Sequence, residues 1–330
     1  MKIFNIIKVF LKSSALRALL SLLLVFVIGL IFNADGSFLK WDTHRDMLRQ
    51  VSVFGILACG MTFVIISGGI DLSVGSILGF SAVIFSLFAI QLGWSPVTTI
   101  ILTLILGTIA GSISGFFISK LKIQSFIATL AMMVFARGMA KLVSGGQKIS
   151  TAVQLPDGTY QYVDIPPIYD ILSAKVLGEN VAVVTIILFV CILFCWVVLS
   201  KTRFGRHVYA VGGNEEAARF AGVPVNSTLI SVYALSGLFC AIAGICQAAQ
   251  ELQGDPEAGS TYELSAIAIV VIGGTSLKGG SGSIWLTLLG ILIIGYLEKI
   301  LSINAVGEET RLMLTGAIII SAVLFQIKKI

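Results

Sequence analysis

The stretch VAVVTIILFVCILFCWVVLS, residues 181–200, contains no charged residue and no proline. An α-helix needs about 20 predominantly apolar residues to cross the hydrocarbon core of a bilayer. The whole chain of 330 residues has the same character, because 57% of it is hydrophobic and only 12% is charged. Soluble domains carry about 25% charged residues. The stretch therefore predicts a membrane-spanning helix, and the composition predicts that lipid surrounds most of the chain.

Other apolar stretches extend this pattern in both directions. The first follows several basic residues, but it is long and no small-residue cleavage site follows it, so we expect an uncleaved span. The predicted fold is an all-α polytopic membrane protein of about ten transmembrane helices in a single domain, residues 1–330, with glycine-broken helices around a central pathway. The predicted spans are residues 16–32, 48–66, 72–92, 97–119, 123–143, 181–200, 228–250, 264–272, 284–302 and 312–326, of which 264–272 is short.

The distribution of basic residues predicts the orientation of these spans. With the N-terminus inside, 13 Lys and Arg residues fall on the inner side and nine on the outer side. Short cytoplasmic loops carry the excess of Lys and Arg in membrane proteins. We therefore expect both termini in the cytoplasm. Residues 201–227 then form a cytoplasmic loop, and residues 144–180 form an extracytoplasmic one.

Several classes of function lack the motifs they need. The sequence contains no G-x-x-x-x-G-K-[ST] loop to hold ATP, no C-x-x-C pair and only two histidines. We expect no catalytic residue, no metal site and no cofactor in this chain. The net charge of +5 comes from basic residues scattered among loop ends, so nucleic-acid binding is not expected. If transport is active, its energy must come from another subunit.

The first of three conspicuous stretches is SGGIDLSVGS, residues 67–76, between the second and third spans. Gly68 and Gly69 allow backbone conformations that other residues resist, and Asp71 or Ser73 can cap the helix that follows. One interpretation is a tight reversal followed by a capped helix. The other is a broken helix that lines a substrate path, because irregular backbone inside a membrane requires protein or a water-filled cavity to satisfy it.

The second stretch, IGGTSLKGGSGS at residues 272–283, repeats the first pattern: an apolar run, paired glycines and small polar residues. Gly273, Gly274 and Thr275 are its candidate path residues, because matching interruptions in two halves of a transporter indicate the binding region. The alternative interpretation is close helix packing through small residues.

The third stretch, residues 202–224, predicts a short helix on the cytoplasmic face. Asn214 is a good N-cap, and the acids Glu215 and Glu216 suit the first turn of a helix. Gly222, two residues before Pro224, ends it after about two turns. A generic solvated loop would also explain these charges.

Together these stretches resemble the signatures of ribose- and galactose-type permeases of ABC importers, within the superfamily of branched-chain amino acid and sugar permeases. The resemblance runs over roughly residues 50–326 in the order of the family. The matching segments are residues 68–75, 126–130 with 136–138, 202–223 and 272–282.

The resemblance implies two permease subunits, this chain and a second copy or paralogue, around one pathway in the bacterial inner membrane. It also implies a cytoplasmic ATPase pair, which would hold ATP and Mg, and an extracytoplasmic sugar-binding protein. The coupling helix that docks on the ATPase would comprise Asn214, Glu215, Glu216, Ala217, Ala218 and Gly222. The translocation path would include Gly68, Gly69, Asp71, Ser73, Gly273, Gly274 and Thr275. Residues 216–218 follow the loose form of the coupling motif.

Two alternatives to a monosaccharide importer remain at this point. The first is an ABC permease for branched-chain amino acids or for a signal derived from a sugar. The second is a secondary transporter or channel that works without ATP, which requires ion-binding residues inside the membrane. Asp71 is the candidate for such a residue.

Overall fold

The computed structural model describes residues 14–154, 158–307, 309–314, 316–317 and 320. Among these residues, eight helices are long and apolar enough to cross a membrane, and a ninth apolar helix, α12 (Tyr262–Gly273), is shorter. The chain is therefore a multi-pass, all-α membrane protein. The predicted span 312–326 lies mostly outside the described residues.

The long helices follow the predicted spans closely. They are α2 (Ser14–Ile31), α3 (Trp41–Ile66), α4 (Val74–Ser86) with the π-helical turn η2 (Leu87–Gln91), α5 (Pro96–Lys120), α6 (Ser125–Ser144), α8 (Val183–Lys201), α11 (Val225–Glu251) and α13 (Ile284–Ile303). A 3₁₀ turn, η1 (Ser37–Leu39), joins α2 to α3. Hydropathy locates the spans well because, inside lipid, a helix must satisfy all of its backbone hydrogen bonds within itself.

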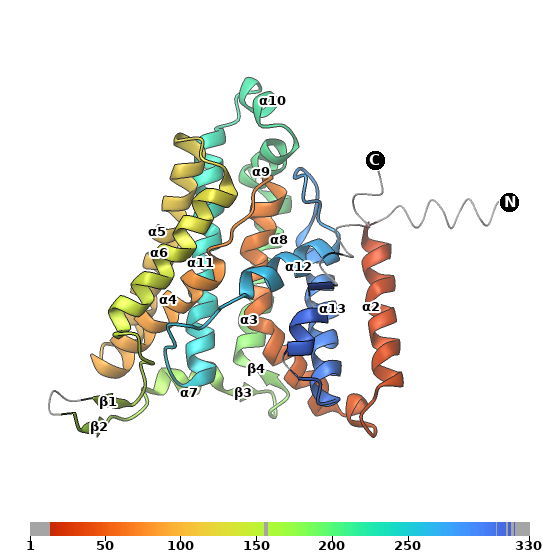
Figure 1. The fold of residues 1–330 in the computed structure, drawn as a ribbon. Coiled ribbons are helices and arrows are strands. Elements are labelled where there is room, and N and C mark those ends of the chain that lie inside the picture. Colours follow the sequence, from red (N-terminus) through yellow and green to blue (C-terminus); the bar gives the residue numbers. More distant parts are fainter. Residues whose placement is uncertain (1–13, 155–157, 308, 315, 318–319, 321–330) are drawn as a thin grey trace.

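Helices α3 and α11 form the centre of the bundle (Figure 1). The last third of α3 is buried on every side, with Phe63, Ile65 and Ile66 fully inaccessible. Helices α2, α5, α6 and α8 lie further out and expose large apolar side chains such as Leu23 and Phe135. These faces are suited to lipid, because lipid tails are as apolar as the side chains themselves.

A seam of glycines joins α5 to α11. A Cβ atom on Gly111 of α5 would lie 2.1 Å from the carbonyl oxygen of Tyr233, and one on Gly237 of α11 would lie 2.1 Å from that of Gly107. The two helix backbones are thus in direct contact. Small residues at a helix interface permit this approach.

The two ends of the bundle differ (Figure 1). One end, here called the α10 end, carries α9 (Arg203–Gly213) and α10 (Glu215–Phe220). The other, called the hairpin end, carries α7 (Pro167–Ser173) and two short antiparallel pairs, β1 (Ala152–Gln154) with β2 (Tyr160–Tyr162) and β3 (Lys175–Val176) with β4 (Val181–Ala182). The first two residues of the predicted span 181–200 therefore belong to β4, and α8 begins at Val183.

Helix α9 was not predicted, because its glycines and charges were interpreted as a loop. Its N-terminus is capped by Thr202, whose hydroxyl accepts a hydrogen bond from the Gly205 N–H at 3.1 Å. Val208 and Val211 are buried at a spacing of three residues, which places them on one face of the helix. That apolar face and its cap were visible in the sequence.

Candidate functional site

The three conspicuous stretches meet at one point near the α10 end, called here the glycine junction (Ile66, Gly68, Gly212, Gly279 and Gly280). The Gly280 N–H donates a hydrogen bond to the Ile66 carbonyl at 2.9 Å. A Cβ on Gly212 would lie 1.8 Å from that same carbonyl oxygen, and one on Gly279 would lie 2.5 Å from the Gly212 oxygen. The end of α3, the end of α9 and the segment before α13 are therefore in backbone contact.

A side-chain hydrogen bond strengthens this meeting point. The Tyr209 hydroxyl, on α9, donates to the Gly282 carbonyl at 2.9 Å. Gly282 in turn lies against buried Thr275, because a Cβ on Gly282 would be 2.5 Å from the Thr275 methyl carbon. Helix α9 is thus tied to the segment between α12 and α13.

The first stretch leaves the end of α3 and returns into the bundle as irregular backbone. Gly68 has a φ of +86°, and a Cβ on Gly69 would lie 2.3 Å from the Tyr233 hydroxyl. The N–H groups of Ile70 and Leu72 donate to the side-chain hydroxyls of Ser125 and Thr129 at 3.3 and 3.1 Å. Helix α6 therefore satisfies this backbone where the helical hydrogen bonds are interrupted.

Asp71 is fully buried within that irregular segment. Its carboxylate accepts hydrogen bonds from the N–H and hydroxyl of Ser73, at 2.9 and 2.5 Å, and from the Ser236 hydroxyl of α11 at 2.7 Å. Ser73 occupies the N-cap position of α4 but its side chain makes no capping bond. Asp71, and not the Ser73 side chain, therefore binds the Ser73 N–H at the start of α4, which has no helical partner.

The second stretch packs two helices together. A Cβ on Gly273 would lie 2.1 Å from the Leu286 oxygen, and one on Gly290 would lie 1.9 Å from the Ile269 oxygen, so the backbones of α12 and α13 touch. Gly274 has a φ of +110° and ends α12. For these glycines the geometry favours the close-packing interpretation over a position on an open path.

A second irregular segment, residues 252–261, runs between α11 and α12 and lies along α4. A Cβ on Gly75 would be 2.0 Å from the Gly259 oxygen. Arg137 of α6 holds the segment, donating to the carbonyls of Ala258, at 2.9 Å, and Pro256. A partly buried guanidinium thus replaces the helical hydrogen bonds that these carbonyls lack.

Helix α10 has the predicted cap and stop. The Asn214 side chain accepts a hydrogen bond from the Ala217 N–H at 2.9 Å, and Gly222 ends the helix with a φ of +80°. Glu215 binds Lys122, from the α5–α6 connection, at 2.9 Å and Arg219 at 2.8 Å. Chiefly through the Lys122 hydrogen bond, the pKa of the Glu215 carboxyl lies below its usual value.

Ala218, one of the residues assigned to the coupling helix, does not lie on the free surface of α10. Ala218 is only 5% exposed and packs in a cluster with Val211, Val225 and Leu229. Two neighbours on α10 behave differently: Ala217 is exposed, and the Phe220 side chain is 91% exposed. Successive side chains point about 100° apart around a helix, so Ala218 faces α9 and α11 while its neighbours face outward.

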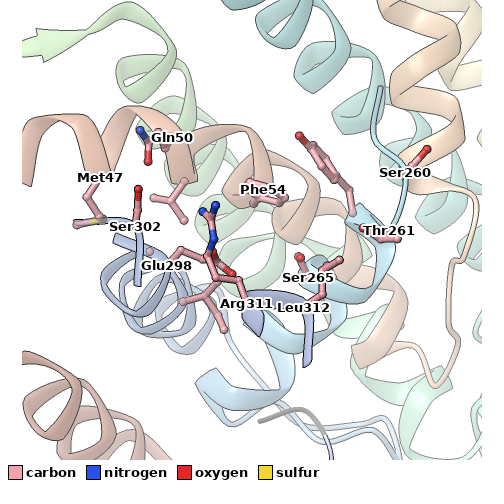
Figure 2. A pocket seen from close by; sticks show the side chains of 14 residues that line it. Met47, Gln50, Phe54, Ser260, Thr261, Ser265, Glu298, Ser302, Arg311 and Leu312 are labelled. Atoms are coloured by element: carbon pink, nitrogen blue, oxygen red, sulfur yellow. The ribbon is translucent and has the colours of Figure 1, made fainter. Parts of the chain in front are cut away.

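A cavity that was not predicted from the sequence lies between α3, the start of α12 and α13 (Figure 2). Its volume is about 430 Å³, within the range of ~300–1,000 Å³ common for small-molecule sites. Figure 2 shows polar side chains from all three helices turned into it, together with Arg311. The residues that carry the polar lining are Gln50, Ser260, Thr261, Ser265, Glu298, Ser302 and Arg311.

The sequence contained one signal for this cavity. Glu298 is an acid within the predicted span 284–302, and acids inside spans usually face protein or water. Asp71 was therefore not the single intramembrane acid to consider. The other lining residues come from segments that only the fold brings together.

Residues 45–323 match the protein family described as branched-chain amino acid transport system / permease component. The chain belongs to this family. As a permease component, it is a transport subunit and not an enzyme. The matched range includes the glycine junction, α10 and the cavity.

Individual relatives in this permease family are similar over nearly their whole length. The ribose import permease protein RbsC of Bacillus subtilis (strain 168) is 42% identical, covering 94% of this chain and 92% of the relative. The protein of the same name from Haemophilus influenzae is 38% identical over 93% and 91%. The xylose transport system permease protein XylH of Escherichia coli (strain K12) is 33% identical over 95% and 92%. No solved structure matches the chain.

Proposed function

We propose that this permease forms the membrane pathway of an ATP-driven importer for monosaccharides. The observation that carries the proposal is the similarity, over more than nine-tenths of the chain, to import permeases named for ribose and xylose. A low-affinity path suits this role, because a separate binding protein would supply the specificity. The cavity with its polar lining supports a small hydrophilic cargo.

The α10 end is the proposed docking surface for a cytoplasmic ATPase, which would hold ATP and Mg. Phe220 is a large apolar side chain exposed on a charged, two-turn helix, and aromatic side chains are enriched at the centres of protein interfaces. Glu216, Ala217 and Arg219 are exposed beside it. Asn214, Glu215, Ala218 and Gly222 shape and anchor the helix, and need not touch the partner themselves.

A movement of α10 has a direct route into the bundle. Ala218 joins it to Val211 of α9 and to Val225 of α11, and α9 reaches α3 and the segment before α13 through the glycine junction. Closure of the ATPases would therefore shift α9 and α11 together. In this proposal the glycines Gly68, Gly69, Gly273 and Gly274 with Asp71, Ser73 and Thr275 act as tight joints that transmit this shift.

The proposal places the α10 end and both termini in the cytoplasm of a bacterial cell, in the inner membrane. The hairpin end would then face the extracytoplasmic binding protein. A second permease, either a copy or a paralogue, would complete the pathway. The excess of basic residues in the loops of the α10 end supports this orientation.

The family description favours one other cargo, a branched-chain amino acid. Reconstitution into liposomes distinguishes the possibilities. With its cognate ATPase and binding protein, we expect ATP-dependent uptake of labelled ribose or xylose and none of leucine. Leucine uptake would show that the cargo is an amino acid and not a sugar. Sugar uptake by the permease alone, driven by an ion gradient, would instead establish a secondary transporter.

A further inference from the structure

The cavity lies in the half of the bundle away from α10. Its lining residues on α3 run from Met47 to Phe54, and Phe54 precedes Ile66 at the glycine junction by 12 residues, or about 18 Å along a helix. On α13, which runs in the opposite direction, the lining residues are near the far end, from Ile294 to Ser302. The cavity is therefore closer to the hairpin end, where cargo would enter.

The polar lining is rich in groups that hydrogen-bond to hydroxyls. Gln50 comes from α3, Ser265 from α12 and Ser302 from α13. The side chains of these three residues form no hydrogen bond with any part of the chain that the structure describes. Figure 2 shows Gln50 and Ser302 beside one another at one side of the cavity and Ser265 at the other, with Arg311 between them. Three helices thus present unused donors and acceptors to one small volume.

An aromatic pair forms one wall. The rings of Phe54 and Tyr262 have centroids 4.3 Å apart, and both residues line the cavity. The two rings are tilted by 42° and share the cavity with polar groups. Aromatic faces beside polar groups match a sugar ring, which has an apolar face of C–H groups and a rim of hydroxyls. Few precisely placed polar groups within an apolar frame are typical of small-molecule sites.

The charges also favour a neutral ligand. Glu298 and Arg311 are the charged residues among the described lining, and their charges are opposite. A sugar phosphate would require an excess of positive charge. A carboxylate and a guanidinium can both hydrogen-bond to hydroxyls of a neutral polyol.

From this juxtaposition we propose that the cavity is where the permease itself contacts the sugar, as a neutral monosaccharide ring held by Gln50, Ser265 and Ser302 against Phe54 and Tyr262. This inference rests on the proposed function. It adds a defined contact point in the pathway, in the half nearer the hairpin end, which the comparisons do not assign.

The first test measures sugar transported per ATP hydrolysed by the complete reconstituted importer. Gln50→Leu and Ser265→Val remove the hydrogen-bonding groups and keep the volume. We expect each to lower this ratio at least tenfold while the ATPase still co-purifies. The matched controls are Gln91→Leu, at the exposed end of η2, and Ser112→Val on α5, both outside the cavity, and these should stay within twofold of wild type.

The second test detects occupancy directly. The five natural cysteines are all buried, so a small thiol reagent should report mainly on an introduced Ser265→Cys. Millimolar ribose or xylose should slow labelling of that cysteine at least fivefold in the assembled importer, and should not affect Gly158→Cys in the β1–β2 connection.

The outcomes separate this inference from the proposed function. If wild type imports sugar but the cavity variants keep the normal ratio and the sugar gives no protection, the cavity inference alone is overturned. If leucine protects Ser265→Cys and the sugars do not, the cavity binds an amino acid and the sugar assignment falls. If wild type imports no monosaccharide, the proposed function and this inference are both overturned.

Discussion

Gly212 and Gly213 are adjacent in the last turn of α9, yet their surroundings differ completely. A Cβ on Gly212 would collide with the Ile66 oxygen at 1.8 Å, whereas one on Gly213 would meet no atom within 4 Å. A flexible side chain can move away from an added methyl group, but a backbone carbonyl held at the end of a packed helix, such as that of Ile66, cannot. The pair therefore separates a packing requirement from a general effect of removing glycine.

The first prediction uses this pair. Gly212→Ala should separate α9 from α3, lower the melting temperature of the purified permease and stop coupled uptake. Gly213→Ala should be neutral or slightly stabilising, since alanine favours a helix over glycine by about 0.5–1 kcal/mol. Thermal unfolding in detergent and uptake by the reconstituted importer measure both. Equal behaviour of the two variants would refute a contact role for the glycine junction.

A second prediction concerns the Asp71 network. Asn can still accept the two hydrogen bonds from Ser73, and its amide can donate to the Ser236 hydroxyl. Asp71→Asn should therefore keep assembly and most uptake. Asp71→Leu should leave buried donors without partners, at a cost of about 1–3 kcal/mol each, and reduce the yield of folded permease. An Asn variant that assembles normally but transports nothing would show that the negative charge itself is needed.

At the scale of elements, α10 combines an anchored face with a free one. Ala218 is buried against α9 and α11, so replacing it with Trp would overpack that cluster and disturb the permease itself. If an Ala218→Trp variant lost ATPase binding, the loss could therefore come from misfolding of the permease and would not report on docking alone. Phe220 avoids this problem because its side chain is 91% exposed.

The third prediction follows from that exposure. Phe220→Ala should leave expression and melting temperature unchanged but weaken ATPase binding. Truncating an aromatic residue at the centre of an interface typically costs about 2 kcal/mol or more, or roughly 30-fold in affinity. Affinity pull-down of the ATPase measures this loss, with Phe32→Ala as the control, because Phe32 is an exposed aromatic residue just after the end of α2. If the ATPase is recovered equally well with Phe220→Ala, α10 does not dock through this residue.

Features of these elements that depend on local signals were predictable from the sequence, and features that depend on contacts between distant elements were not. Residues 214–222 were predictable as a helix because the cap at Asn214 and the stop at Gly222 are local signals. The burial of Ala218 was not, because it depends on Val211 and Leu229 from other elements. The cavity was missed for the same reason, since α3, α12 and α13 contribute its lining from distant parts of the chain.

At the scale of the whole molecule, α3 and α11 fill the centre and the remaining helices shield them. This arrangement gives the bundle two chemically distinct ends, one with α9 and α10 and one with the hairpins (Figure 1). The spans were predictable from hydropathy, whereas the irregular segment at 67–73 was only indicated by its glycines and the one at 252–261 was not predicted. Their hydrogen-bond partners, Ser125, Thr129 and Arg137, lie on α6 and could not be paired from sequence spacing.

The fourth prediction tests the orientation of these ends. Gly158 and Gly213 both have open space around their Cβ positions. A cysteine at Gly213 should be tolerated, and one at Gly158, whose φ is +83°, should cause only local backbone strain in the exposed β1–β2 connection. A membrane-impermeant thiol reagent added to intact spheroplasts should label Gly158→Cys at once. It should reach Gly213→Cys only after the membrane is permeabilised. The opposite labelling pattern would show that the chain has the reverse orientation, with α10 outside the cytoplasm.

The glycine seam between α5 and α11 holds these two helices together as one rigid unit. Their backbones interlock at Gly107, Gly111 and Gly237, so neither can slide or roll without carrying the other. Helix α10 grips both members at the same end, through Val225 at the start of α11 and through Lys122 just after α5. The 25 residues of α5 extend about 38 Å from that grip. In the proposed coupling, a small tilt imposed at α10 would therefore become a larger displacement at the hairpin end, as in a lever with a long arm.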